Sequence, residues 1–116
     1  MKIIVNSLYI CVDNMERAID FYERFLNQMV SKRDDIYSIF DINGFRLGLF
    51  AYKKVGEEHI YGSNCIPSFE TESLNDLKKL LYNKKIVFPL TQIGTNWVAE
   101  ICDSEGNHIE ITAPIT

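Results

Sequence analysis

The first half of the chain predicts a strand, a helix and three further strands. A strand is predicted at residues 1–12, where Leu8, Ile10 and Val12 alternate with more polar positions. Asp13 then predicts a helix N-cap, with Glu16 three residues later as in a capping box. The predicted helix carries one apolar stripe, formed by Met15, Ala18, Ile19, Tyr22 and Leu26. The three strands that follow are predicted at residues 29–33, 36–42 and 45–52.

The second half repeats this order of elements. Residues 65–71 predict a strand, and Pro67 within it indicates a sheet edge or a bulge. Ser73 predicts the N-cap of a helix whose apolar face is leucine. Three more strands are predicted at residues 86–93, 97–102 and 107–112. The predicted organisation is therefore one domain over 1–116, with a first module at 1–52, a polar connector at 53–63 and a second module at 64–116.

Two similar turns fix how the halves align. The sequence D-I-N-G ends at Gly44 and D-S-E-G ends at Gly106, and a strand follows each turn. Aligned on these turns, Gly48 of the first half matches Glu110 of the second. One half alone cannot bury both faces of its sheet, so we expect the two to pack together. The predicted fold class is α+β, with two βαβββ modules forming curved mixed sheets around a concave groove and a helix on each convex side.

Composition narrows the class of protein. The chain has 116 residues, of which 47% are hydrophobic and 24% charged, as expected of a soluble globular protein. Its net charge of -4 argues against partners such as nucleic acid or an anionic membrane surface. No apolar run reaches the roughly 20 residues that a membrane span needs. The three widely spaced cysteines predict reduced thiols in a cytoplasmic protein rather than disulfides or a zinc site.

Strand alternation divides the side chains of each module between two faces. The aliphatic set is expected against the helix, and a mixed polar and aromatic set is left for the concave face. That second set is Ser7, Tyr9, Cys11, Arg46, Gly48, Phe50, His108, Glu110 and Thr112. A concave face of this composition suits a small-molecule cavity. The alternative is that it faces water or a partner subunit.

Two segments resemble a known superfamily. The segment Y-I-C-V-D-N-M-E-R-A-I-D-F-Y-E-R-F-L, with its pair Phe21 and Tyr22, is similar to the opening strand and helix of the vicinal oxygen chelate superfamily. The segment D-S-E-G-N-H-I-E-I resembles its C-terminal signature, with Ser104 where proline is usual. This superfamily includes glyoxalase I, bleomycin-resistance proteins, fosfomycin-resistance enzymes and extradiol dioxygenases. The resemblance implies the duplicated fold, and it implies a homodimer.

The resemblance also implies where a divalent metal would be held. Metal-dependent members use side chains from four strands, and those registers correspond here to Ser7, Gly48, about Ile66, and Glu110. Of these only Glu110 is a usual ligand, whereas a divalent ion normally needs at least three protein ligands. His108 shares the face of Glu110 but leaves a weak site, and the position of His59 in the connector cannot be predicted. The sequence therefore predicts the metal-free branch, with no cofactor.

Glu110 then has two possible roles. It can anchor an amine or hydroxyl of a ligand, or it can make a local bond, for example to Ser7 or to a backbone amide. In the binding-protein branch of the superfamily, aromatic residues enclose a planar ligand. The residues that can do so here are Trp97, Tyr9, Phe40 and Phe50, although each can equally be packing in the core or at an interface.

The predicted function is a small-molecule binding protein that sequesters a planar or cationic compound without a metal. The alternative is a divalent-metal-dependent lyase, isomerase or thiol transferase with atypical ligands. No residue is predicted to be catalytic, because nothing beside Glu110 resembles a nucleophile or an oxyanion hole. The predicted ligand-binding residues are Ser7, Tyr9, Arg46, Phe50, Trp97, His108 and Glu110.

Overall fold

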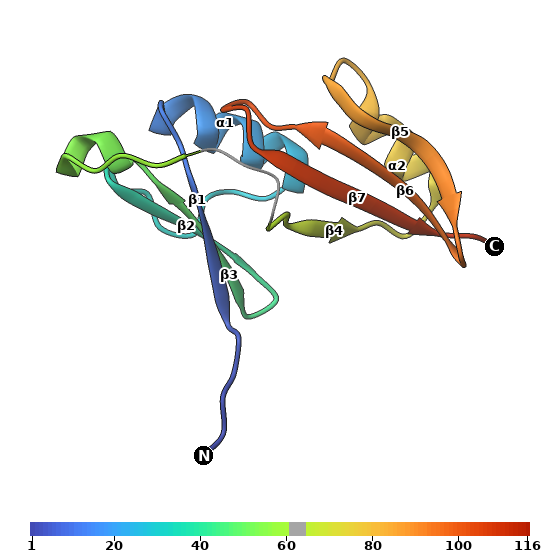
Figure 1. Ribbon diagram of the computed structural model, residues 1–116, viewed down its shortest axis with the longest axis horizontal. Coiled ribbons are helices and arrows are strands. Elements are labelled where there is room, and N and C mark those ends of the chain that lie inside the picture. Colours follow the sequence, from blue (N-terminus) through green and yellow to red (C-terminus); the bar gives the residue numbers. More distant parts are fainter. Residues whose placement is uncertain (61–64) are drawn as a thin grey trace. The chain divides into compact units, whose positions relative to one another are not determined.

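The computed structural model describes residues 1–60 and 65–116 and divides the chain into two compact units, Met1–Ile60 and Tyr61–Thr116 (Figure 1). Residues 61–63 of the predicted connector, and residue 64 at the predicted start of the second module, lie outside the described residues. Both units combine one α-helix with one mixed sheet, as the predicted α+β class requires.

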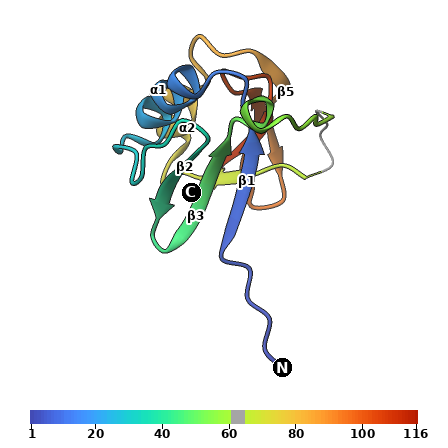
Figure 2. The same ribbon diagram turned by 90° about the vertical axis from the view of Figure 1, so that its left-hand side faces the viewer.

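The first unit contains a three-stranded sheet. Its elements are β1 (Ser7–Cys11), α1 (Met15–Leu26), β2 (Tyr37–Ile42), β3 (Phe45–Phe50) and the short 3-10 helix η1 (Tyr52–Val55). The strand order is β1-β3-β2, with β3 parallel to β1 and antiparallel to β2. Figure 2 shows these strands side by side. The strand predicted at 45–52 thus ends at Phe50, and η1 begins at Tyr52.

The N-cap of α1 corrects the prediction by one residue. Asn14, in an extended conformation with φ of -130°, accepts a hydrogen bond from the Arg17 N–H and caps the helix. Asp13 instead accepts a hydrogen bond from the Tyr52 hydroxyl and pairs with the Lys53 ammonium at 3.0 Å. The predicted capping box is therefore wrong. Asp13 ties η1 to the start of α1, and the neighbouring asparagine does the capping.

The strand predicted at residues 29–33 is also wrong, because it is reduced to a single bridge between Lys32 and Ile39. Side chains take its place beside β2. The Gln28 amide donates to the Asp41 carbonyl, and the Ser31 hydroxyl accepts from the Asp41 N–H. The Val30 N–H donates to the Glu23 carboxylate rather than to a neighbouring strand. These bonds satisfy the backbone of β2 without a regular ladder.

The second unit has the complete strand–helix–three-strand order. Its elements are β4 (Ser68–Glu70), α2 (Leu74–Leu81), β5 (Ile86–Ile93), β6 (Asn96–Cys102) and β7 (His108–Pro114). The sheet order is β4-β7-β6-β5, with β4 parallel to β7. Ser73 caps α2 by accepting from the Asp76 N–H, as predicted. Strand β4 is shorter than the predicted 65–71, and it lies at a sheet edge as Pro67 indicated.

The two D-x-x-G turns are built differently. In the first, Asn43 and Gly44 have φ of 53° and 91°, the left-handed pair of a type I′ hairpin turn, and Asp41 accepts from the Gly44 N–H. In the second, Asp103 is only 7% exposed. Its carboxylate accepts from the backbone N–H groups of Glu105 and Asn107, and from the Asn107 amide. This buried carboxylate fixes the register of β6 and β7.

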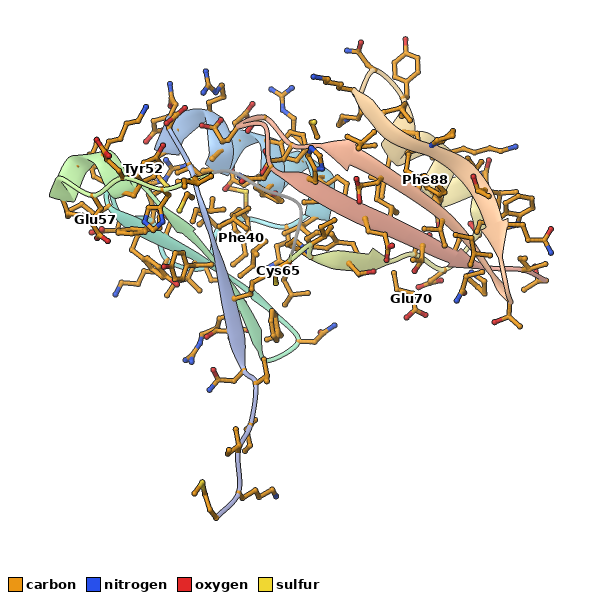
Figure 3. The ribbon with its side chains drawn as sticks, viewed as in Figure 1. Phe40, Tyr52, Glu57, Cys65, Glu70 and Phe88 are labelled. Atoms are coloured by element: carbon orange, nitrogen blue, oxygen red, sulfur yellow. The ribbon has the colours of Figure 1, made fainter. Side chains whose placement is uncertain are left out.

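Each helix covers one face of its own sheet with apolar residues. In the first unit Tyr22 and Ile19 of α1 are fully buried, as are Leu47, Leu49 and Phe40 of the sheet, and Phe40 is labelled in Figure 3. In the second unit the buried set is Leu77, Ala99, Ile101, Ile109, Ile111 and Ala113. The opposite face of each sheet is thereby left for other chemistry. Among the described residues, no helix has the length and apolar character that a membrane crossing requires.

Candidate functional site

Six of the residues predicted for the concave face lie together on the helix-free face of the first sheet. The register pairs Ser7 with Arg46, Tyr9 with Gly48, and Cys11 with Phe50. Strand β2 adds residues of the same parity, since Tyr37 pairs with Phe50 and Ile39 with Gly48. The backbone pairing therefore makes one continuous surface from residues that are far apart in the sequence.

Three aromatic rings form the centre of this surface. The Tyr9 ring meets Phe50 edge-on at 5.5 Å and Tyr37 at 6.1 Å, and the Tyr37 and Phe50 rings lie 6.1 Å apart. Tyr9 is 49% exposed, so the group is open on one side. We call Tyr9, Tyr37 and Phe50 the aromatic triad. Sequence reasoning missed Tyr37, although its position on a strand beside Phe45–Phe50 gave it the correct parity.

Tyr37 lies directly on Gly48. A Cβ atom built on Gly48 would meet the hydroxyl, Cζ and Cε1 of Tyr37, all closer than 3.0 Å. The ring therefore occupies the space that a side chain on residue 48 would need. Burial raises the pKa of the Tyr37 hydroxyl, and the nearby Tyr9 raises it further, while Arg46 opposes the shift. Tyr37 is accordingly a neutral phenol over a wide pH range.

Cys11, at the end of the same face, is not activated as a nucleophile. Burial raises the pKa of its thiol, and the negative charge of Glu57 raises it further. A thiol is reactive when its pKa is lowered by cations or a helix N-terminus. Cys11 therefore stays protonated and acts as a small apolar side chain.

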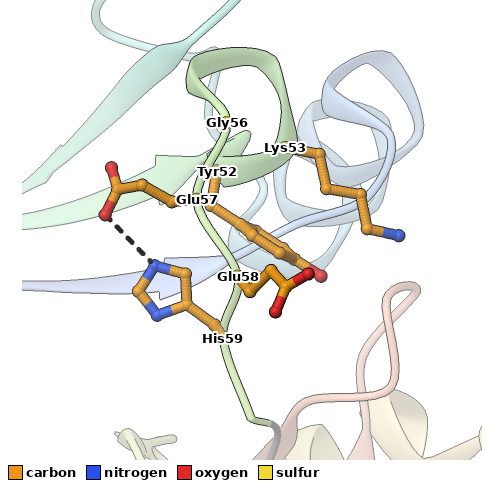
Figure 4. Close-up of a pocket in the computed structure, with 6 residues that line it drawn as sticks. All are labelled: Tyr52, Lys53, Gly56, Glu57, Glu58 and His59. Atoms are coloured by element: carbon orange, nitrogen blue, oxygen red, sulfur yellow. Dashed lines mark ion pairs between the residues drawn. The ribbon is translucent and has the colours of Figure 1, made fainter.

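A pocket adjoins the triad on the segment that follows β3. It has a volume of about 500 Å³ and is lined by Tyr52, Lys53, Gly56, Glu57, Glu58 and His59 (Figure 4). The position of His59, which the sequence did not predict, is now defined. Its ring lies edge-on to Tyr52 at 5.0 Å and to Phe50 at 6.0 Å, and its Nε2 is 3.8 Å from a Glu57 carboxylate oxygen. His59 thus extends the aromatic triad toward an acidic loop.

In the second unit, Glu110 has a local hydrogen-bond partner. The Ser68 hydroxyl donates to the Glu110 carboxylate at 2.6 Å, and the two residues are register partners on β4 and β7. Ser7, which the sequence offered as one possible local partner, belongs to the first unit, where its register partner on the sheet is Arg46. A serine two residues after Ile66 was the available signal, but the register of β4 was needed to use it.

Glu110 also faces a second carboxylate. Glu100 is its direct partner across β6 and β7, so the two acids project from neighbouring positions on one sheet face. The His108 Nδ1 lies 3.4 Å from the Glu100 carboxylate, with the two side chains 31% and 19% exposed. The sequence contains a signal for this pair, because counting residues in both directions from the D-S-E-G turn places Glu100 opposite Glu110 on the hairpin. Glu100, Glu110, His108 and Ser68 form what we call the acidic group.

Two of the four predicted aromatic residues lie on helix-facing sides. Trp97 pairs with Ala113, which is fully buried, so it has the parity of the α2 face and not that of Glu110. Phe40 is fully buried in the first unit and packs near Tyr22 of α1 at 6.2 Å between ring centroids. Tyr9 and Phe50 remain on the open face.

The residues in the four implied metal registers do not fit a divalent ion. Ser7 offers a neutral hydroxyl, Ile66 is a half-buried aliphatic residue, and Gly48 has no side chain and is covered by Tyr37. Only the Glu110 carboxylate is a usual ligand. Across residues 1–60 and 65–116, no three histidine, cysteine or acidic side chains are grouped so that they could hold a metal ion.

Two α+β units, each with a strand–helix–strand order and a D-x-x-G hairpin, define a protein built from tandem modules of the βαβββ type, in which the first module has one strand fewer than the second. The chain belongs to the Glyoxalase/Bleomycin resistance protein/Dioxygenase superfamily, whose family model matches residues 4–111. The resemblance stated from the sequence is thereby confirmed.

Solved structures agree on the fold. A glyoxalase-related enzyme from Fulvimarina pelagi is 14% identical with a TM-score of 0.75, covering 92% of this chain and 85% of its own. A glyoxalase/bleomycin resistance protein/dioxygenase family enzyme from Burkholderia phytofirmans is 14% identical with a TM-score of 0.75, covering 95% and 98%. Lactoylglutathione lyase from Agrobacterium tumefaciens is 15% identical with a TM-score of 0.68, covering 92% and 90%. No curated protein matches the chain in sequence.

Proposed function

We propose that this chain is a small-molecule binding protein of the glyoxalase/bleomycin-resistance type, which sequesters a planar or cationic compound without a metal ion. One observation carries the proposal. The register that implies a metal ligand in the first unit holds Gly48, and the Tyr37 ring fills the space above it. An aromatic surface has replaced a donor atom at the centre of that sheet.

The aromatic triad supports a planar ligand. Its rings meet edge to face and leave one side open, so a flat ring can lie against them over a large apolar area. Tyr and Phe present this area with little loss of side-chain entropy, because they have only two rotatable side-chain bonds. The His59 ring lengthens the surface beyond Phe50.

The acidic group supports a cationic ligand or ligand portion. Glu100 and Glu110 are directly paired and half-buried, so a cation between them would relieve the repulsion of two like charges. The net charge of -4 favours the approach of cations over a longer range. Ser68 holds one oxygen of Glu110 and leaves the other side of the carboxylate for a ligand.

The test combines metal analysis with ligand titration. Purified protein is analysed by inductively coupled plasma mass spectrometry, and bleomycin and ethidium are titrated by calorimetry with and without EDTA. We expect no stoichiometric divalent ion, no thermal shift with Ni²⁺, Zn²⁺ or Mn²⁺, and binding of at least one compound that EDTA leaves unchanged. Absence of binding to both compounds and to any molecule seen by native mass spectrometry contradicts the proposal.

The alternative function is a metal-dependent lyase, isomerase or thiol transferase with atypical ligands. The observation in its favour is the closeness of His108 to Glu100 beside Glu110, which gathers a nitrogen and carboxylate oxygens on one face. One equivalent of bound Ni²⁺, Zn²⁺ or Mn²⁺, lost in a Glu100→Gln variant, would select this function over the first.

We further propose that the chain forms a cytoplasmic homodimer. Strand β5 is a sheet edge, and its apolar residues Ile86, Val87, Phe88 and Ile93 are all more than one-third exposed. Exposed apolar edges favour pairing with another chain. Cys11, Cys65 and Cys102 form no disulfide, which supports a reducing compartment. Light scattering after size-exclusion chromatography measures the assembly, and a monomeric mass at micromolar concentration contradicts it.

A further inference from the structure

The Tyr37 hydroxyl is a polar group placed within an apolar surface. It lies above Gly48, between the Tyr9 ring and the side of the sheet that carries Arg46. The Tyr37 side chain is half-buried, and within residues 1–60 and 65–116 its hydroxyl is not one of the fully buried polar atoms that lack a partner. The hydroxyl is therefore open to solvent, and a ligand atom can replace the water that hydrates it.

Gly48 is what allows this placement. Glycine weakens the interior of a strand and commonly marks a close approach by another group. Here the close approach is made by the tip of the Tyr37 ring, and any larger residue at position 48 would displace it. The packing of the Tyr37 ring on Gly48, which we call the seat, therefore requires both of these residues. It holds the Tyr37 hydroxyl at a defined point on the open face.

The groups around the hydroxyl favour a ligand atom that accepts a hydrogen bond. A phenol with a raised pKa remains protonated and donates. The exposed Arg46 side chain lies on the same face, and it makes no ion pair within the described part of the chain. Asp41 is paired with Arg46 across the sheet, but its carboxylate accepts from the Gly44 N–H in the turn.

We propose that Tyr37, seated on Gly48, is the specificity-determining residue of the aromatic triad. Its ring contacts a planar ligand, and its hydroxyl donates a hydrogen bond to an acceptor, such as a carboxylate or carbonyl, on the edge of that ligand. This inference rests on the proposed function, because it assumes that the triad is a ligand surface.

The test uses two probes with the same ring and different edge groups, 2-naphthoate and 2-naphthylmethylammonium, titrated by calorimetry. Only the first has an acceptor. We expect Tyr37→Phe to weaken 2-naphthoate binding about five-fold, the usual effect of one hydrogen bond, and to change binding of the ammonium probe less than about two-fold. Tyr82→Phe is the matched control, because Tyr82 is 80% exposed and lies outside the triad, and it should leave both affinities unchanged.

A second variant tests the seat. Gly48→Ala adds the one atom that collides with the ring, so we expect binding of both probes to weaken by about ten-fold as the triad is rearranged. If this variant does not fold, the Tyr37→Phe result decides. Two results overturn this inference and leave the proposed function standing. In the first, Tyr37→Phe binds 2-naphthoate as tightly as the wild type does. In the second, the wild type binds the ammonium probe and does not bind 2-naphthoate. Failure of the wild type to bind either probe, bleomycin or ethidium overturns the proposed function as well.

Discussion

The two units share a strand order but carry opposite chemistry at matching positions. In the first, the row across the sheet reads Tyr9, Gly48 and Ile39. In the second, the row reads Ser68, Glu110 and Glu100. The order and directions of β1, β3 and β2 are reproduced by β4, β7 and β6, whereas the apolar row of the first sheet corresponds to a polar row in the second. The duplication therefore preserves backbone pairing and leaves each half free to acquire its own side chains.

The two D-x-x-G turns offer the largest expected difference between the units. Asp103→Ala removes a buried carboxylate that accepts from three N–H groups, whereas Asp41→Ala removes an exposed one that accepts from a single turn N–H. We expect Asp103→Ala to lower the free energy of unfolding by about 3 kcal/mol and Asp41→Ala by about 1 kcal/mol or less.

Urea denaturation followed by circular dichroism measures both turn variants, and Asp41→Ala serves as the control for Asp103→Ala. Equal losses of stability would show that burial of the second turn contributes nothing, and the register of Glu100 and Glu110 would then have to be fixed by strand pairing alone.

The polar row of Ser68, Glu110 and Glu100 predicts a smaller change in the free energy of unfolding, with the opposite sign. Glu100→Gln removes one of two like charges that lie directly across the sheet from each other, so we expect stability at pH 8 to rise by about 0.5 kcal/mol. Glu70→Gln is the matched control, because Glu70 on β4, labelled in Figure 3, has Thr112 rather than an acid as its register partner. Thermal or urea unfolding of both variants measures the difference. A loss of stability in Glu100→Gln alone would mean that the contact of Glu100 with His108 outweighs its repulsion of Glu110.

The smallest expected effect is the change in stability when Tyr37, whose ring covers Gly48 of the apolar row, ionises at alkaline pH. Burial raises the folded-state pKa of Tyr37 above its ordinary value, so the unfolded chain loses this proton first. The stabilising contribution of Tyr37 is complete below about pH 10 and declines as the pH rises through the folded-state pKa. Tyrosine Cζ chemical shifts measure the titration, and Tyr37 should ionise at a higher pH than a free tyrosine side chain. Ionisation of Tyr37 at the pH of free tyrosine would contradict its burial.

Local signals in the sequence predicted most of the fold. Ser73 precedes a leucine stripe and caps α2, and the bounds of β5 agree with the predicted 86–93. Errors arose where two residues compete for one role. Asp13 and Asn14 can both cap a helix, and only the contact of Asp13 with Tyr52 and Lys53 decides between them.

The candidate site was less predictable, because it depends on register between strands. Parity placed Tyr9, Arg46 and Phe50 correctly on one face, since alternation is local. Tyr37 was missed because its ring leans along the sheet from Phe50 toward Gly48, which no sequence period encodes. Trp97 was grouped with Glu110 on aromatic character alone, and the pairing with Ala113 puts it on the other face.

The close approach of Tyr37 to Gly48 also restricts how this lineage can change. Every amino acid that replaces glycine adds atoms where the ring already lies, so a side chain can enter position 48 only if the Tyr37 ring moves away. That movement would take the hydroxyl from its place on the open face and open the triad. Residues 37 and 48 are therefore expected to vary together among related chains.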